Sequence, residues 1–127
     1  MNVEALKKAR DCLAKSTTYD QAIWAHQECG SPACVAGHIV VANGCRIERL
    51  NVHNLGARFF AVSDDKATEI ELAAASIADL DDLEMADMFD GNVYCYDENN
   101  ISPTKGEALA MLDHAIEHGE VRWPRRE

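Results

Sequence analysis

The stretch SPACVAGHIVVANG, residues 31–44, decides how the rest of the chain is interpreted. Ser31 offers a side-chain oxygen that caps a helix, and Pro32 has a backbone angle suited to the first helical position. The Asn-Gly pair at the end of the stretch is typical of a helix stop. Between these signals the residues are small or apolar on nearly every side, with His38 as the polar exception. A helix that is apolar all round is buried, so the sequence predicts a central helix over residues 32–43.

Apolar residues at helical spacing predict four further helices around this one. The last of them begins with a capping box, because Thr104 stands three residues before Glu107. The four are expected over residues 2–15, from Asp64 or Asp65 to Ser76, after Asp79-Leu80-Asp81 up to a stop at Gly91, and from Thr104 to His118-Gly119.

Residues 45–62 mix apolar and basic side chains without a clear period, so a short strand and helical turns are both open there. Residues 93–96 are expected to form a short strand, and residues 121–123 a short strand or a docked tail. A chain of 127 residues fits one domain. The expected fold is therefore mainly α, with α+β as the alternative: a single compact helical domain over residues 1–127, with about five helices and one or two short strands.

Composition excludes several settings. No apolar run reaches the 18 or more residues that cross a bilayer, and the charged N-terminus lacks the apolar stretch of an export signal. Five cysteines, an odd number without regular spacing, fit a reducing compartment. We expect a cytoplasmic protein that is not bound to membranes.

The net charge of −10 is concentrated in residues 59–90, which hold ten acidic residues and one basic residue. Binding of a nucleic-acid backbone requires clustered Lys and Arg, so direct nucleic-acid binding is not expected. One part of this segment has carboxylates and no basic residue. It contains Asp79, Asp81, Asp82, Glu84, Asp87 and Asp90.

Two interpretations of these six residues are open. Asp81 and Asp82 precede a predicted helix, where its dipole favours negative charge, and a solvated helix face is a common cause of a charge run. Alternatively, the six carboxylates form a surface that imitates phosphates and binds a basic groove on a protein partner. We take these six as the predicted partner-binding residues.

Cysteine and histidine are dense between residues 26 and 45, which raises the question of a zinc site. The spacing C-x4-C-x3-H-x6-C matches no zinc knuckle or finger pattern, and free cysteines are commonly small core residues. Cys34 in the first turn of a helix, with His38 one turn later, also outlines a nucleophile and its base. Burial raises a thiol pKa, however, and no third group orients the histidine. We predict no catalytic residue and no cofactor, and keep as metal candidates Cys29, Cys34, His38 and Cys45.

The stretch CGSPACVAGH, residues 29–38, resembles the C-G-[ST]-x-A-C-[IV]-A-G-like core of a loose group of small phage-borne and bacterial proteins of unknown function. The resemblance extends over most of residues 22–123. It implies a setting on mobile genetic elements and assigns no chemistry.

These observations favour a small acidic inhibitor or adaptor that binds a host protein complex with a basic nucleic-acid-binding surface. An anti-CRISPR-like or other anti-defence protein is one form of this function, and the host cytoplasm is its expected location. Two alternatives stay open. One is a structural zinc or thiol-containing protein built on the Cys29, Cys34 and His38 cluster, and the other is a cysteine-dependent enzyme.

Overall fold

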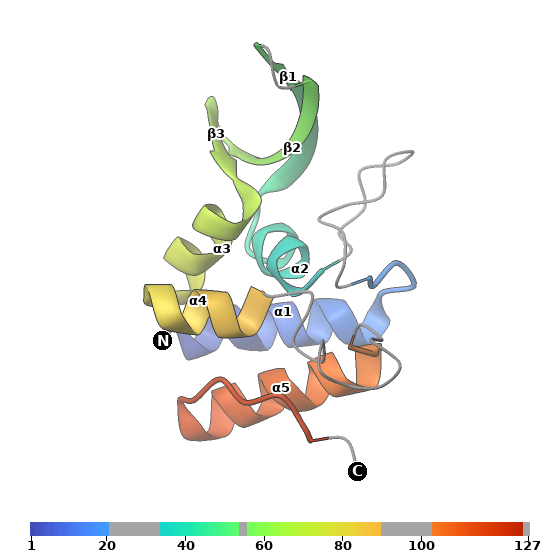
Figure 1. Cartoon of the computed structure of the whole chain (residues 1–127), viewed down its shortest axis with the longest axis vertical. Helices are drawn as coiled ribbons and strands as arrows, with labels where there is room; N and C mark the ends of the chain where they lie inside the picture. The colour runs from blue at the N-terminus through green and yellow to red at the C-terminus, as the bar shows by residue number, and fades with distance from the viewer. Residues whose placement is uncertain (21–33, 54–55, 90–102, 126–127) are drawn as a thin grey trace.

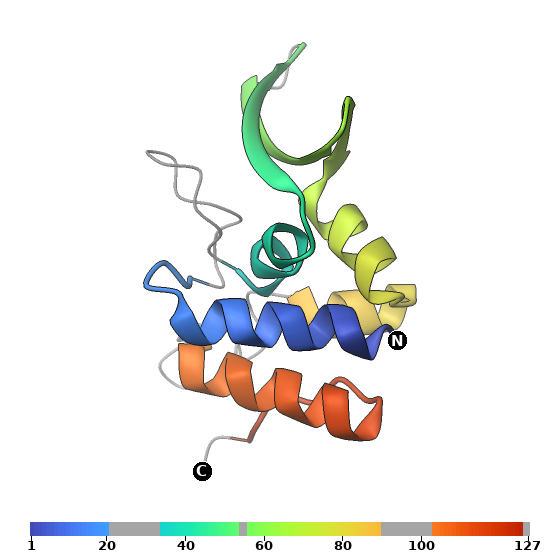
Figure 2. The ribbon, with the colours of Figure 1, turned by 180° about the vertical axis from the view of Figure 1, so that it is seen from behind.

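The computed structural model describes residues 1–20, 34–53, 56–89 and 103–125. Helices α5, α1 and α2 are stacked in that order, and a small sheet extends beyond α2 (Figures 1 and 2). Helix α3 connects the sheet to α4, and α4 contacts both α2 and α3 (Figure 1). In chain order the elements are α1 (Val3–Lys15), α2 (Val35–Ala42), β1 (Arg46–Val52), β2 (Gly56–Ser63), β3 (Lys66–Glu69), α3 (Ile70–Ala78), α4 (Asp82–Phe89) and α5 (Lys105–His118).

Helices α1 and α5 run antiparallel along one another (Figure 1). The side chain of Asn2 caps α1 by accepting a hydrogen bond from an amide of its first turn. Thr104 and Glu107 form the predicted capping box of α5, and Gly119 ends that helix in the left-handed conformation. The predictions for both helices are confirmed, because the signals at their ends are local and do not depend on packing.

Helix α2 is central, as predicted, and each of its residues from Val35 to Val40 is buried. Its predicted start at residue 32 is wrong: the helix begins at Val35, with Cys34 as the N-cap residue. The Cys34 Sγ accepts a hydrogen bond from the Gly37 amide at 3.4 Å. The predicted caps Ser31 and Pro32 lie outside the described residues.

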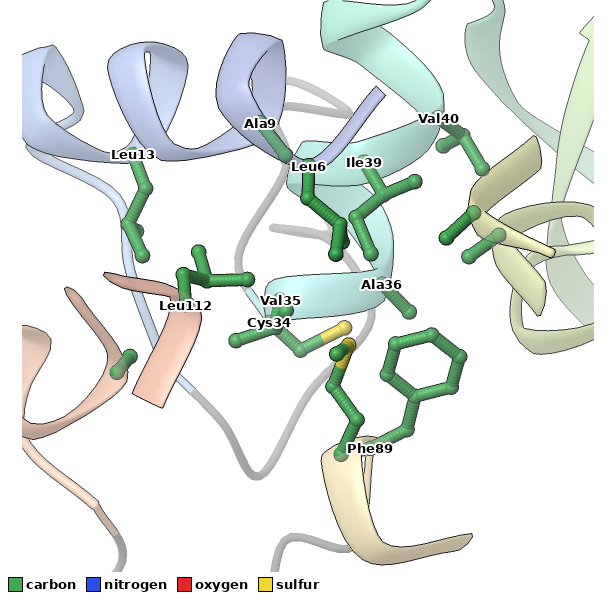
Figure 3. Packing of buried hydrophobic residues seen from close by; sticks show 14 of the residues in the cluster. Leu6, Ala9, Leu13, Cys34, Val35, Ala36, Ile39, Val40, Phe89 and Leu112 are labelled. Atoms are coloured by element: carbon green, nitrogen blue, oxygen red, sulfur yellow. The ribbon is translucent and has the colours of Figure 1, made fainter. Parts of the chain in front are cut away.

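The helices meet in one apolar core (Figure 3). Leu6 and Leu13 of α1, Ile39 of α2 and Leu112 of α5 are fully buried in it. Phe89 at the end of α4 packs into the same cluster, so α4 is anchored through its last turn.

The three strands form an antiparallel sheet with β2 in the centre. The register pairs Arg46 with Val62 at one end of β1 and Val52 with Gly56 at the other. Between β2 and β3 it pairs Ser63 with Lys66, which leaves a turn of two residues.

This sheet corrects the predicted fold class. The protein is not a mainly helical domain with one or two short strands but an α+β fold with five helices and a three-stranded antiparallel sheet in the described residues. The sequence signal was weak because both faces of β1 carry charge: Glu48 lies on one face and Arg49 on the other. A strand is recognised in a sequence when apolar residues of a buried face alternate with polar residues of an exposed face. In β1 both faces are partly exposed, so the sequence does not alternate in this way.

Helix α3 also begins later than predicted. Asp64 does not cap a helix but occupies the two-residue turn between β2 and β3, where its φ angle is 54°. The helix begins at Ile70, and its N-cap residue Glu69 makes no side-chain capping bond. Residues 66–69, which were expected to form the first turn of the helix, instead pair with β2 as a strand.

The C-terminal segment is a docked tail and not a strand. Trp123 is buried, and its Nε1 donates a hydrogen bond to the backbone oxygen of Asp87 at 2.7 Å. The predicted strand at residues 93–96 and the predicted helix stop at Gly91 lie outside the described part of the chain.

Candidate functional site

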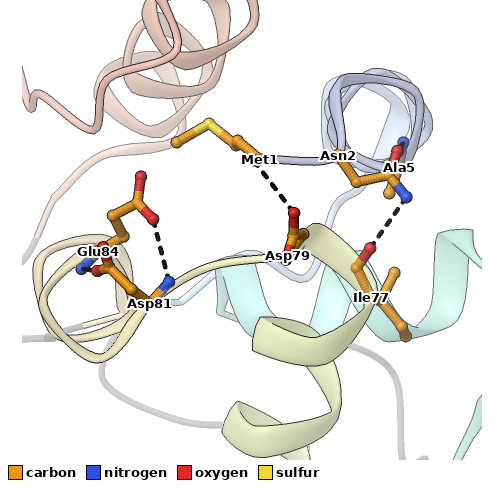
Figure 4. Close-up of polar contacts among 7 residues, drawn as sticks. All are labelled: Met1, Asn2, Ala5, Ile77, Asp79, Asp81 and Glu84. Atoms are coloured by element: carbon orange, nitrogen blue, oxygen red, sulfur yellow. Dashed lines mark hydrogen bonds and ion pairs between the residues drawn. The ribbon is translucent and has the colours of Figure 1, made fainter.

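Helix α4 is fixed at both ends. At its N-terminus Asp81 and Glu84 form a reciprocal cap: the Glu84 amide donates to Asp81 Oδ1 at 2.8 Å, and the Asp81 amide donates to Glu84 Oε1 at 3.0 Å (Figure 4). In its second half the Trp123 indole holds the Asp87 carbonyl, and Met88 and Phe89 are buried. The outward side of α4 is therefore presented by a helix with little freedom to move.

Four exposed residues occupy that outward side: Asp82, Leu83, Ala86 and Asp87, which we call the acidic stripe. Their spacing places them next to one another on two successive turns. Leu83 is 78% exposed, the highest value among the large exposed hydrophobic residues. The stripe thus presents one large apolar side chain, Leu83, between two carboxylates.

The six predicted partner-binding residues have different local roles. Asp79 lies 3.5 Å from the amino group of Met1, whose positive charge partly offsets its own (Figure 4). Asp81 and Glu84 serve as the cap of α4, as the local interpretation of the charge run predicts. The carboxylates of Asp82 and Asp87 form no ion pair within the described residues, and Asp90 lies outside them. Asp82 and Asp87 are therefore the carboxylates most available to a partner.

The neighbourhood of the stripe is negative. From Ile70 to Phe89, helices α3 and α4 and their connection carry six acidic residues and no Lys or Arg. An exposed apolar residue in a negative field suits a cationic surface that has an apolar pocket, because burial supplies affinity and charge supplies orientation.

Cys34 does not have the properties of a nucleophile. Its side chain is 1% exposed and lies among apolar side chains of the core (Figure 3). Burial raises the pKa of the Cys34 thiol to about 11, against the amide hydrogen bonds that favour the thiolate. The thiol is protonated at neutral pH, so packing and capping are its roles in this structure.

The proposed metal candidates are not brought together. Among the described residues no group of three or more His, Cys, Asp and Glu side chains is placed to hold a metal ion. Both ring nitrogens of His38 are already engaged: Nδ1 lies 2.8 Å from the Cys34 carbonyl oxygen and Nε2 lies 2.8 Å from Ser16 Oγ. Cys45 is half-buried in the connection between α2 and β1, and Cys29 lies outside the described residues.

The contact between Ser16 and His38 was missed by the sequence analysis, since 22 positions separate the two residues. Its geometry is that of a serine hydroxyl beside a histidine base. The Ser16 Oγ also accepts from the Thr18 amide at 3.1 Å and lies 3.1 Å from Thr18 Oγ1. The Lys105 Nζ donates to the backbone oxygen of Ser16. The hydroxyl is held in a network that joins α1, α2 and α5, which is a structural role.

No helix within the described ranges is long and apolar enough to cross a membrane. No family model matches the chain, and neither the curated proteins nor the solved structures that were compared with it give a match. The resemblance of residues 29–38 to phage-borne proteins therefore stays a prediction.

Proposed function

We propose that this protein is a small acidic binding protein of a phage or other mobile genetic element. It occupies the basic nucleic-acid-binding surface of a host protein complex in the host cytoplasm, and so inhibits or adapts that complex. An anti-CRISPR-like or other anti-defence protein is one form of this function.

The acidic stripe is the observation that carries the proposal. Asp82 and Asp87 flank the exposed Leu83 on a helix fixed by its cap and by Trp123. Carboxylates at fixed positions replace the phosphates that Arg and Lys of the partner otherwise hold. A rigid helix loses little conformational freedom on binding, which favours affinity.

Charge alone gives weak contacts, because exposed ion pairs contribute about 0–1 kcal/mol each. Leu83 supplies what charge does not: an apolar side chain that a pocket of the partner buries, worth about 1.5–3 kcal/mol on full burial. The proposal therefore requires both the carboxylates and the leucine.

The test is capture of partners from host lysate, with mass spectrometry, by the wild type and by Asp82→Lys/Asp87→Lys. Glu84 is left unchanged because it caps α4. Asp11→Lys/Glu117→Lys is the matched control, since both residues are exposed on other helices and the change in net charge is the same.

A supporting result has two parts. The captured protein is lost with the stripe variant and retained with the control, and it binds the wild type about tenfold or more tightly than the variant, a difference of about 1.4 kcal/mol. A DNA or RNA oligonucleotide then competes with the protein for that partner. A partner that binds the stripe variant equally well, or that nucleic acid does not displace, contradicts the proposal.

Leu83→Ala separates the two components. We expect weaker binding with an unchanged salt dependence, because the apolar contact is lost and the charges remain. If Leu83→Ala binds as tightly as the wild type, the interaction depends on charge alone, and the proposal that a pocket of the partner buries Leu83 is wrong.

A further inference from the structure

Two histidines stand on successive turns at the end of α5, the outermost helix of the stack (Figures 1 and 2). His114 and His118 are four positions apart, which places them on the same face of the helix. Their ring centroids are 4.6 Å apart, and the ring planes are tilted by 42°. The side chain of His114 is 26% exposed and that of His118 is 54% exposed. An ion in solution therefore has access to the pair.

The distance between the two rings suits a shared metal ion. Imidazole is a preferred ligand of Zn²⁺ and Cu²⁺, and it binds them as the neutral ring. With metal–nitrogen bonds of about 2.1 Å, two imidazoles on one ion have ring centroids roughly 4.5–5 Å apart. The observed separation of 4.6 Å lies within this range. The helix thus already holds the two rings at the distance that a shared ion requires.

Glu120 orients the ring of His114. Gly119 ends α5 at a φ angle of 68°, and after this turn the Glu120 side chain reaches back to the helix. His114 Nε2 lies 3.2 Å from Glu120 Oε2 and is the donor, because a carboxylate only accepts. The lone pair of the neutral ring is then on Nδ1. A metal-binding histidine usually donates its second ring nitrogen to a carboxylate or carbonyl in this way.

The charges around the pair favour a cation. The carboxyl end of a helix carries a partial negative charge, and two carboxylates add to it. One is Glu120, and the other is Glu117, whose Oε2 lies 3.9 Å from His118 Nε2. Arg122 opposes them, but it binds Oε1 of Glu120 at 3.2 Å and leaves Oε2 to His114. Two carboxylates and a helix end therefore face one guanidinium.

We propose that His114 and His118 bind a divalent transition-metal ion of the Zn²⁺ class at the end of α5. The two imidazoles are its protein ligands. Water completes the coordination, because no third His, Cys, Asp or Glu side chain in the described ranges is placed to join them. The ion links two turns of α5 in the folded chain, so its binding stabilises the fold. This site is separate from the acidic stripe and does not depend on the proposed function.

The experiment is isothermal titration calorimetry of the full chain with Zn²⁺, and with Mg²⁺ for comparison. Mg²⁺ prefers oxygen ligands, so it reports on binding by carboxylates alone. We expect the wild type to bind Zn²⁺ and not Mg²⁺. His118→Gln removes one ligand at an exposed position and is expected to weaken Zn²⁺ binding about tenfold or more, a difference of about 1.4 kcal/mol.

His53→Gln is the matched control, because it removes an exposed histidine from the turn that follows β1. It is expected to bind Zn²⁺ like the wild type. The wild type and both variants keep all five cysteines, so any Zn²⁺ held by thiols is the same in the three proteins. Imidazole signals in NMR spectra give a second measurement: Zn²⁺ is expected to shift two of them, the ones that His114→Gln and His118→Gln remove.

Three results overturn the inference. They are a wild type that binds no Zn²⁺ or binds Mg²⁺ equally well, a His118→Gln variant that circular dichroism shows to be folded and that binds Zn²⁺ as tightly as the wild type, and a His53→Gln variant that loses as much affinity as His118→Gln. The two proposals fail separately, since Asp82→Lys/Asp87→Lys leaves both histidines of α5 in place and is expected to retain Zn²⁺ binding.

Discussion

The helical body and the sheet arm of this protein differ in how their side chains are used. The body, made of α1, α2, α3, α4 and α5, places Leu6, Leu13, Ile39 and Leu112 out of contact with water. In the arm, made of β1, β2 and β3, the buried residues with described side chains are Ala61 and Val62. The arm is thus held by backbone pairing and cross-strand contacts, and the body by burial.

This difference determines whether a substitution changes the stability of the protein or only its surface. In the body, a lost methylene group leaves a cavity and lowers the free energy of unfolding. In the arm, the same loss changes a surface that water already contacts. Leu50 and the charged residues around it are therefore in contact with water, and the core leucines are not.

The largest expected effect compares Leu112→Ala in the body with Leu50→Ala in the arm. Leu112 is fully buried, so its truncation is expected to lower the free energy of unfolding by about 3 kcal/mol. Leu50 keeps 36% of its surface exposed, so its truncation leaves no closed cavity and is expected to cost less, about 1–2 kcal/mol. Urea denaturation measures both.

The two variants delete the same atoms, so each is the control of the other. Equal losses of stability would show that the arm shares the core of the body, contrary to the separation described above. Both variants are expected to keep the slope of the denaturation curve, because neither changes how much surface unfolding exposes.

The same difference explains which parts of the fold the sequence predicted. Helices α1 and α5 were predicted with their ends, because caps such as Thr104 with Glu107 are local signals and their apolar stripes face a core. The three-stranded sheet was not predicted, and a strand within residues 45–62 was only one of two open possibilities, because the pairing of Arg46 with Val62 is long-range and the strand faces are partly exposed. The α+β fold thus depends on long-range strand pairing, which local sequence patterns do not reveal.

The candidate site was predicted in part. The sequence placed a run of carboxylates at α4, and the structure distinguishes Asp82 and Asp87 from the capping pair Asp81 and Glu84. It did not indicate Leu83, because an apolar residue in an amphipathic helix is expected inside. Exposure of Leu83 depends on how α4 is rotated by its burial of Met88 and Phe89, which is a tertiary property.

The second prediction concerns His38, which is the buried polar residue of the body. Burial lowers the pKa of His38 from its ordinary value of 6.5, and the positive charge of Lys105 lowers it further, against the hydrogen bond to the Cys34 carbonyl. The unfolded chain therefore binds a proton more readily than the folded chain. Stability from the neutral imidazole is fully present above pH 6.5 and is lost as the pH falls through the lower pKa of the folded state.

The slope of stability against pH from this one group is at most about 1.4 kcal/mol per pH unit. Urea denaturation of the wild type and of His38→Gln between neutral and mildly acidic pH isolates it. The Glu120 carboxyl, whose pKa His114 and Arg122 lower from 4.5, contributes in a more acidic range. A wild type and a His38→Gln variant with parallel pH profiles would contradict the burial of a neutral His38.

The smallest expected effect lies in the arm, at the turn between β2 and β3. Asp64 has a φ angle of 54°, whereas its neighbour Asp65 does not have a positive φ. A left-handed conformation costs a residue with a side chain about 1–2 kcal/mol. Glycine avoids that strain but loses about 0.5–1 kcal/mol in backbone entropy on folding.

Asp64→Gly is therefore expected to raise the free energy of unfolding by about 0.5 kcal/mol, the difference between these two contributions. Asp65→Gly is expected to lower it by a similar amount, because there the entropy loss is not offset.

Because the two substitutions are expected to change the free energy of unfolding in opposite directions, together they test the conformation of the turn. Both variants remove one carboxylate from the same exposed loop, so the change in net charge is identical and only the backbone angle differs. Thermal or urea unfolding of the two variants beside the wild type measures the order. If Asp64→Gly is the less stable of the pair, residues 64 and 65 do not form this turn. The start of α3 at Ile70 then loses its explanation, because the pairing of β3 with β2 depends on that turn.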